Sequence, residues 1–136
     1  MQLEEPYINS YSDKDYPYQK ESYQIIGICM EVHRLLGKGF LEIVYKDALE
    51  YEFKQKNILF EREKKYNINY KEIVLPHNFY ADFIVMDKII IEIKGSSTLI
   101  SEHRAQVINY LAASKLKLGL LINFGESSLK VERIIL

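Results

Sequence analysis

The apolar residues of this chain are spaced in two different ways, and each spacing indicates a different kind of element. From residue 21 to residue 36 they recur every three or four positions, as on the buried face of a helix. Gly37 and Gly39 favour a helix end at this point. A second stripe with the same spacing predicts another helix over about residues 41–56, with Asn57 as its terminator.

After residue 57 the period becomes two. Tyr66, Ile68 and Tyr70 alternate with polar residues, which indicates a half-buried strand. Residues 73–75 are expected to pair back across a turn at residues 71–72, and Pro76 is expected to interrupt the run. Two strongly apolar, β-branched runs follow within residues 79–94, with a tight turn expected at residues 86–88. Together they predict a central hairpin.

The last third of the chain contains both helical and strand-like spacing of apolar residues. A third helix is predicted over about residues 101–114, with Ser101 as its N-cap. Residues 118–123 form an apolar run typical of a buried strand, and a final strand is expected at residues 130–136. A helix between two strands of one sheet implies a crossover connection. The order of elements therefore predicts an α/β fold, with a mixed central sheet and helices on both faces.

The first 20 residues show neither period. They are polar and rich in tyrosine, with Tyr7, Tyr11, Tyr16 and Tyr18 among Asp, Ser, Lys and Pro. We interpret residues 1–20 as an extended or mobile N-terminal arm, ahead of a single domain over residues 21–136. Because tyrosine is enriched at protein interfaces, docking of the arm on a partner or a second copy is an alternative, which would give a homodimer.

Composition narrows the picture further. The chain has 136 residues, of which 48% are hydrophobic and 27% charged, as in an ordinary globular domain. No apolar stretch reaches the roughly 20 residues that span a bilayer, so no membrane partner is expected. The first residues do not resemble a secretory signal, and the single cysteine, Cys29, suits a reducing cytoplasm. The net charge of −1 does not by itself indicate nucleic-acid binding.

The central hairpin carries the candidate chemistry. Folded about Asp87, it places Asp82 opposite Glu92, with Cβ atoms about 5 Å apart. Lys94 follows two residues after Glu92 and shares its face. Two carboxylates this close repel each other unless a cation or a proton lies between them, and a hard divalent metal suits oxygen ligands. The alternative is a solvated face with weak cross-strand ion pairs.

Residues on two predicted helices border this hairpin. Glu42 lies in the first turn of the second helix, beside the buried stripe that contains Tyr45. Gln106 and Tyr110 share a face of the third helix with His103. We expect this face to support the site, with His103 close to a phosphate of the substrate. The alternatives are structural: a carboxylate favoured by the helix dipole, and a polar edge of a packing face.

The joint pattern is more specific than any of its parts. Gly39, Glu42 and Tyr45 come first, then Asp82 with Glu92 and Lys94, then Gln106 and Tyr110. The order resembles the GxxExxY family, a branch of the PD-(D/E)XK nuclease superfamily, over about residues 23–135. The resemblance implies a restriction-endonuclease-like α/β/α sandwich and a site that binds Mg²⁺ or Mn²⁺. It implies metal ligands at Glu42, Asp82 and Glu92, catalytic residues at Asp82, Glu92, Lys94 and Gln106, and supporting residues at Tyr45 and Tyr110.

The hypothesis from sequence is metal-dependent hydrolysis of phosphodiester bonds in nucleic acid, with DNA as the expected substrate. A metal held by carboxylates lowers the pKa of bound water and polarises a phosphate. The Lys94 ammonium would stabilise the charge that develops on that phosphate. The alternative is a module that keeps the nuclease fold without cleaving and binds nucleic acid or a protein.

Overall fold

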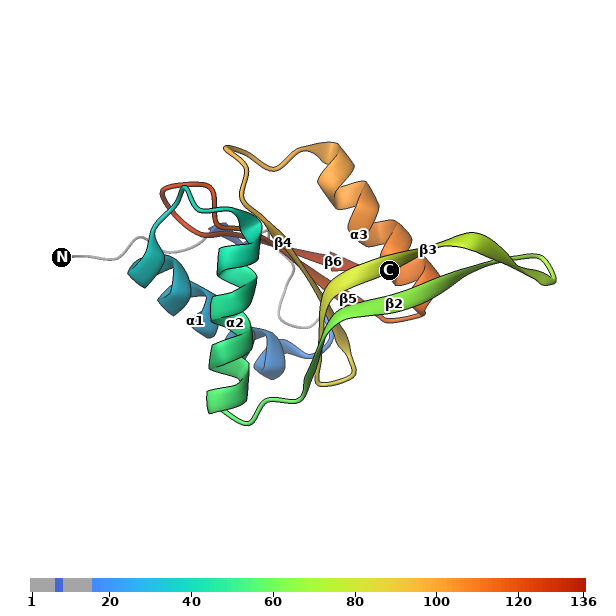
Figure 1. The fold of residues 1–136 in the computed structure, drawn as a ribbon, viewed down its shortest axis with the longest axis horizontal. Coiled ribbons are helices and arrows are strands. Elements are labelled where there is room, and N and C mark those ends of the chain that lie inside the picture. The colour runs from blue at the N-terminus through green and yellow to red at the C-terminus, as the bar shows by residue number, and fades with distance from the viewer. Residues whose placement is uncertain (1–6, 9–15) are drawn as a thin grey trace.

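A mixed sheet between two helical layers forms the body of the molecule (Figure 1). The computed structural model describes residues 7–8 and 16–136. Helices α1 (Gln19–Leu36) and α2 (Glu42–Gln55) pack on one face of the sheet, and α3 (Ser101–Ser114) packs on the other. The predicted α/β/α arrangement is confirmed. In the part of the chain that the structure describes, no helix combines the length and the apolar character needed to cross a bilayer.

The described strands follow the order β1-β6-β5-β4-β3-β2 across the sheet. Their bounds are Tyr7–Ile8 for β1, Phe60–Tyr70 for β2, Ile73–Val85 for β3, Ile89–Lys94 for β4, Leu118–Asn123 for β5 and Lys130–Ile135 for β6. Strands β4 and β5 run parallel and are joined through α3, as the predicted crossover requires. β1 is parallel to β6, and the remaining neighbours are antiparallel.

Two predicted boundaries on β2 and β3 are wrong. Strand β2 begins at Phe60, six residues before the predicted start, because its charged residues also alternate between half-buried and exposed positions. Pro76 does not interrupt β3. It lies where the β2–β3 register shifts between Asn67 and Asn69, a kind of irregularity that tolerates the missing N–H of proline.

The predicted N-cap of α3 is also wrong by one residue. Ile100 occupies that position, and Ser101 is the first helical residue. The backbone N–H of Ile100 donates to Nδ1 of His103 at 3.2 Å, while the N–H of His103 donates to the Ile100 carbonyl. A histidine side chain therefore satisfies a backbone donor at this helix start, where a serine hydroxyl was expected.

Two hydrophobic cores of unequal size hold the layers together. The larger lies between the sheet and the α1–α2 layer, and includes Phe53 and Phe83 with ring centroids 5.5 Å apart. The smaller lies under α3 and includes Val107, Leu111 and Leu121. Cys29 is fully buried in the larger core, where desolvation raises the pKa of its thiol. Its complete burial is consistent with a structural role.

The predicted N-terminal arm is only partly within the described residues. Tyr7 and Ile8 pair with Lys130 and Val131 of β6. Tyr16 is buried in the larger core, and the guanidinium of Arg133 lies 4.3 Å from its ring centroid. Residues 1–6 and 9–15, including Tyr11, lie outside the described residues, so the role of the arm stays a prediction.

Candidate active site

The β3–β4 hairpin places Asp82 opposite Glu92, as predicted. Its register pairs Phe83 with Ile91, Ile84 with Ile90 and Val85 with Ile89. Asp82 and Glu92 are the next residues on each strand, and the Asp82 N–H donates to the Glu92 side chain. The turn is tight because Met86 and Asp87 both adopt left-handed backbone conformations, with φ of 57°.

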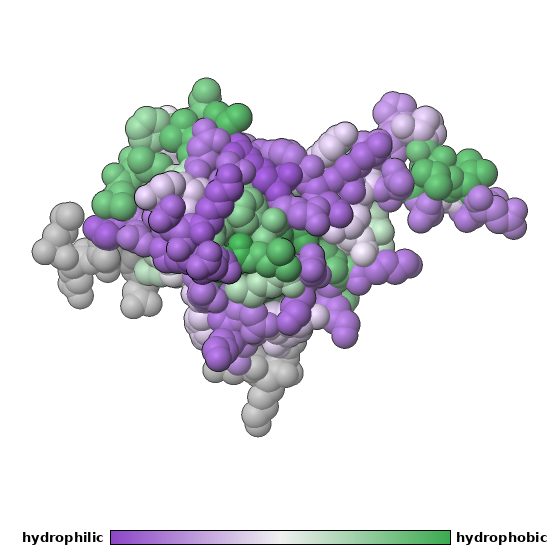
Figure 2. Space-filling model, turned by 60° about the horizontal axis from the view of Figure 1, so that its bottom comes forward, coloured by the Kyte–Doolittle hydropathy of each residue, from purple (hydrophilic) through white to green (hydrophobic). Residues whose placement is uncertain are grey.

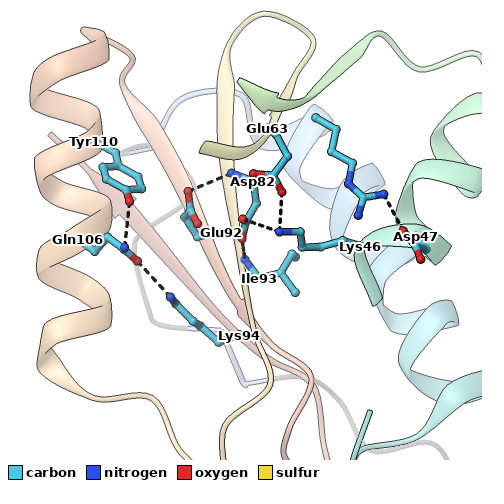
Figure 3. Close-up of polar contacts among 10 residues, drawn as sticks. Lys46, Asp47, Glu63, Asp82, Glu92, Ile93, Lys94, Gln106 and Tyr110 are labelled. Atoms are coloured by element: carbon cyan, nitrogen blue, oxygen red, sulfur yellow. Dashed lines mark hydrogen bonds and ion pairs between the residues drawn. The ribbon is translucent and has the colours of Figure 1, made fainter. Parts of the chain in front are cut away.

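The two strands separate at this pair, and side chains replace the next ladder bonds. The backbone N–H of Asp82 donates to Oε1 of Glu92 at 3.2 Å, and the N–H of Ile93 donates to Oδ2 of Asp82 at 2.8 Å (Figure 3). Each carboxylate thus binds a backbone donor of the opposite strand. The arrangement holds the two acidic side chains close together where the sheet opens.

The proximity of the carboxylates has an electrostatic consequence. Burial, followed by the charge of Asp82, raises the pKa of Glu92 to about 9, while the nearby ammonium of Lys94 opposes the shift. At neutral pH, Glu92 therefore keeps a proton when no added cation lies beside the pair. Two carboxylates that share positive charge in this way form a typical acid–base or metal-binding pair.

The alternation of side chains between the two faces of the sheet breaks in β3 at Asp82 and in the neighbouring strand β2 at Glu63. Phe83 packs in the larger core and Ala81 in the smaller one, although strict alternation would place both on one face. On β2, Phe60 contacts the larger core and Tyr66 the smaller. Between them, Glu63 has a φ of 55°, a conformation that non-glycine residues rarely adopt. The break turns Asp82 and Glu63 toward the edge of α2.

Lys46 of α2 bridges these two acidic residues. Its Nζ lies 2.6 Å from Oε1 of Glu63 and 3.0 Å from Oδ1 of Asp82. Burial lowers the pKa of Lys46, but its hydrogen bonds to Glu63 and Asp82 outweigh burial and raise it, so the ammonium stays charged.

Sequence reasoning missed both Lys46 and Glu63. Lys46 lies one helical turn after Glu42, which was the available signal for a residue on the same side of α2. Glu63 gave no signal, because the predicted strand began three residues after it.

A second polar chain runs from β4 to α3. Nζ of Lys94 donates to Oε1 of Gln106 at 3.1 Å, and Nε2 of Gln106 donates to the Tyr110 hydroxyl at 2.9 Å. The ring of Tyr110 stacks on Phe79 with a centroid distance of 4.0 Å. Burial, and then the charge of Glu92, raises the pKa of Tyr110. The predicted face of α3 therefore meets the hairpin and orients the Lys94 ammonium.

The other predicted residues stand apart from this cluster. Glu42 is exposed in the first turn of α2, where its Cγ would lie 3.3 Å from a Cβ added at Gly95, just beyond β4. Within the described ranges, no three His, Cys, Asp or Glu residues gather closely enough to hold a metal ion. Glu42 is therefore not assembled with Asp82 and Glu92, and its role as a third ligand stays a prediction.

Tyr45 and His103 make structural contacts. Tyr45 is fully buried, its hydroxyl donates to the Gly37 carbonyl at 2.6 Å, and it accepts from the Phe40 N–H at 3.3 Å. It thereby fastens the loop that leads into α2, between Gly37 and Glu42. His103 binds the backbone at the start of α3. Both residues support the elements around the site, and no contact of either with the carboxylate pair is seen among the described interactions.

The donor set fits a hard divalent cation. Asp82 and Glu92 offer carboxylate oxygens at one point, and Mg²⁺ is commonly held by one or two carboxylates with water completing its shell. The proton on Glu92 and the ammonium of Lys46 are the positive charges that now balance the pair. A bound metal would have to displace the proton of Glu92 and the ammonium of Lys46. Substitutions at these two residues therefore test the metal site.

The comparisons with known proteins agree with this geometry. A family model described as the PD-(D/E)XK nuclease superfamily matches residues 19–134, which includes the hairpin and all three helices. No curated protein and no solved structure matched the chain. The match covers most of the chain, and the restriction-endonuclease-like fold agrees with it. The chain belongs to the PD-(D/E)XK nuclease superfamily.

Proposed function

We propose that this protein hydrolyses phosphodiester bonds of nucleic acid, with DNA as its substrate and Mg²⁺ or Mn²⁺ as its cofactor. The observation that carries the proposal is the contact between Asp82 and Glu92 beside an ammonium, Lys94, that Gln106 holds in place. Membership of a nuclease superfamily, whose members generally use divalent metals, supports it. The single, buried Cys29 is consistent with the reducing cytoplasm where we expect the enzyme to act.

Each residue of the cluster has a distinct task in this proposal. A bound divalent metal would supply Lewis acidity toward water and phosphate. Asp82 and Glu92 would hold it, after Glu92 gives up its proton. Lys94 would direct positive charge at the phosphate as negative charge develops there, and the Gln106–Tyr110 chain would restrict the ammonium to that position.

The test is cleavage of labelled DNA and RNA by purified protein with Mg²⁺ or Mn²⁺. We expect DNA cleavage that stops when the metal is chelated. Asp82→Asn and Lys94→Ala should each lower the rate by at least about a hundredfold, because each removes a group that acts at the transition state. Circular dichroism would verify that both variants fold. Lys117→Ala, which removes an exposed lysine just before β5, is the matched control and should cleave as the parent does.

Two outcomes would contradict the proposal. If Asp82→Asn and Lys94→Ala cleave as fast as the parent, the activity belongs to another site or to a contaminant. If the parent binds nucleic acid in a salt-dependent manner but cleaves none with either metal, the protein is a non-cleaving module. Glu42→Gln in the same assay tests whether Glu42 completes the metal shell, through a weaker apparent affinity for Mn²⁺.

A further inference from the structure

The outer half of the β2–β3 hairpin projects from the body of the molecule (Figure 1). Strand β4 pairs only with residues 83–85 of β3, so residues 66–80 form a ribbon of two strands without a third neighbour. An isolated two-stranded ribbon is marginally stable in water. A stack of three rings supports its base, since Phe79 lies 5.2 Å from Tyr66 and 4.0 Å from Tyr110 between centroids.

The tip of the ribbon is apolar and exposed. Tyr70, Ile73 and Val74 are 55%, 58% and 57% exposed. Figure 2 shows an apolar patch near the end of the projecting arm, surrounded by hydrophilic residues. The ammonium of Lys71, in the turn, lies 5.5 Å from the Tyr70 ring centroid. Apolar side chains held away from every core and next to a cation are typical of a contact surface.

Basic residues lie at the base of the ribbon. Lys64 and Lys65 come just before it and Lys64 pairs with Glu61, whereas within residues 66–80 the charge of Lys71 is balanced by Glu72. The same segment contains Asn67, Asn69, Asn78 and His77, all able to donate hydrogen bonds. An amide-rich surface with basic residues at its base is complementary to a polyanion that also presents hydrogen-bonding base edges.

A groove lies between this ribbon and α3, and it reaches Tyr110. It has a volume of about 570 Å³ and is lined by Ile68, Asn69, Phe79, Asn109, Tyr110, Ala112, Ala113 and Lys115. Tyr110 lines the groove and also accepts the hydrogen bond from Gln106 that leads to Lys94. The groove therefore meets the polar chain of the candidate site at Tyr110.

We propose that the β2–β3 ribbon is an arm that grips duplex nucleic acid beside the bond to be cleaved. The inference rests on the proposed function. One strand of the duplex lies in the groove between the ribbon and α3, with Lys115 at its phosphates. The tip enters the major groove, which admits a two-stranded β-ribbon, and places Tyr70, Ile73 and Val74 against base edges.

The geometry sets a length for the substrate. Ile73 lies nine positions before Asp82 on β3. At about 3.3 Å per residue these positions span about 30 Å, which corresponds to about nine base pairs at about 3.4 Å each. A duplex that ends well before that length on the ribbon side would reach the active site without reaching the tip.

The experiment measures binding, separately from cleavage. Fluorescence anisotropy with labelled duplexes in Ca²⁺, at fixed salt, would compare the parent with a variant carrying Tyr70→Thr, Ile73→Thr and Val74→Thr. Threonine keeps strand propensity while removing apolar area. We expect about a tenfold loss of affinity for long duplexes and no loss for duplexes shorter than about nine base pairs on the ribbon side. The matched control is Leu41→Gln with Ile43→Gln, which removes exposed apolar area at α2 and should leave binding unchanged.

Each outcome decides the inference separately from the proposed function. Equal affinity of the parent and the ribbon variant would overturn the arm while leaving the cleavage assay intact. The same holds if the ribbon variant changes the mass in solution from dimer to monomer without changing duplex affinity, because a second copy would then cover the tip. If the ribbon variant loses affinity but the parent cleaves nothing, the arm stands and the hydrolase proposal fails.

Discussion

The two faces of the sheet are built from the same strands yet differ in how completely they are covered. On the face toward α1 and α2, apolar residues such as Phe83, Ile91 and Leu120 pack in one large core. On the face toward α3, Ile90 and Leu121 join a smaller core, and the same face also carries charged residues. Glu92, Lys94 and Glu132 belong to these strands, and Arg104 of α3 forms a 2.5 Å ion pair with Glu132.

The difference shows where a small domain can place costly polar groups. Two helices exclude water from the first face, so a charge there needs a partner inside the core, as Arg133 has in the ring of Tyr16. A single helix covers only part of the second face, so carboxylates and an ammonium lie at its margin with each other as partners. Glu92 and Lys94 therefore lie on the side of the thinner layer, whereas Asp82 turns to Lys46 at the edge of α2. Stability comes mainly from the thicker layer.

Adjacent leucines of β5 test this division, and their effect should be the largest. Leu120 and Leu121 are both fully buried but belong to different cores, and Leu121 pairs with Glu92 in the sheet. Leu120→Ala and Leu121→Ala should each lower the free energy of unfolding by about 2–5 kcal/mol, by chemical denaturation. Only Leu121→Ala should also weaken Mn²⁺ binding in calorimetry, because its cavity lies beside Glu92. Equal weakening by folded Leu120→Ala would contradict the division.

The pKa of Glu92 predicts an intermediate effect on stability. Its value rises from 4.5 to about 9 on folding, so between these values the folded protein holds a proton that the unfolded chain lacks. The stabilisation is complete below pH 4.5 and is lost as pH rises through about 9. Without metal, the parent should lose on the order of a few kcal/mol between about pH 5 and pH 9, in urea titrations at several pH values. Glu92→Gln, which has no proton to lose, should show a flatter profile, and parallel profiles would disprove the assignment.

Lys46 offers the smallest and most specific test. Its ammonium lies on Oδ1 of Asp82, where it competes with any cation that the carboxylate binds. Lys46→Met should therefore tighten Mn²⁺ binding by about tenfold, or about 1.4 kcal/mol, measured by calorimetry at neutral pH.

The matched control is Arg62, which is adjacent on β2 to Glu63, a partner of Lys46. Arg62 joins the same helix to the same strand through Asp47 at 2.8 Å and Glu50 at 3.6 Å. Arg62→Met should leave Mn²⁺ binding unchanged. If Lys46→Met weakens the binding of Mn²⁺, then the lysine positions Asp82 for the metal and does not compete with it.

Much of the fold followed from local patterns. The three helices have the predicted faces, and their bounds agree within two residues. The hairpin about Asp87 has the predicted register, because the tight turn at Met86 and Asp87 fixes which residues of the two apolar runs lie opposite each other. The contact of Gln106 with Lys94 also followed, since helical spacing and the crossover place α3 over β4.

The missed features depend on long-range contacts. The start of β2 at Phe60 was missed because Arg62 and Lys64 occupy half-buried positions, where the sequence analysis looked for apolar residues. The polar cluster around Asp82 was incomplete for the same reason, since Glu63 lies on that unpredicted part of the strand. Tyr45 was grouped with the site by its spacing, yet its hydroxyl binds the loop at Gly37 and Phe40.

The sequence by itself determined the periodicities, the hairpin register and the PD-(D/E)XK superfamily, because each depends on neighbours within a few residues or on a motif read in order. The tertiary structure alone decided how the acidic pair is balanced. Lys46 reaches Asp82 across 36 residues of chain, and the alternation of two strands breaks at Glu63 and Asp82. Local pattern contains no such information, because the charge of a buried carboxylate depends on every group that packing brings within a few ångströms.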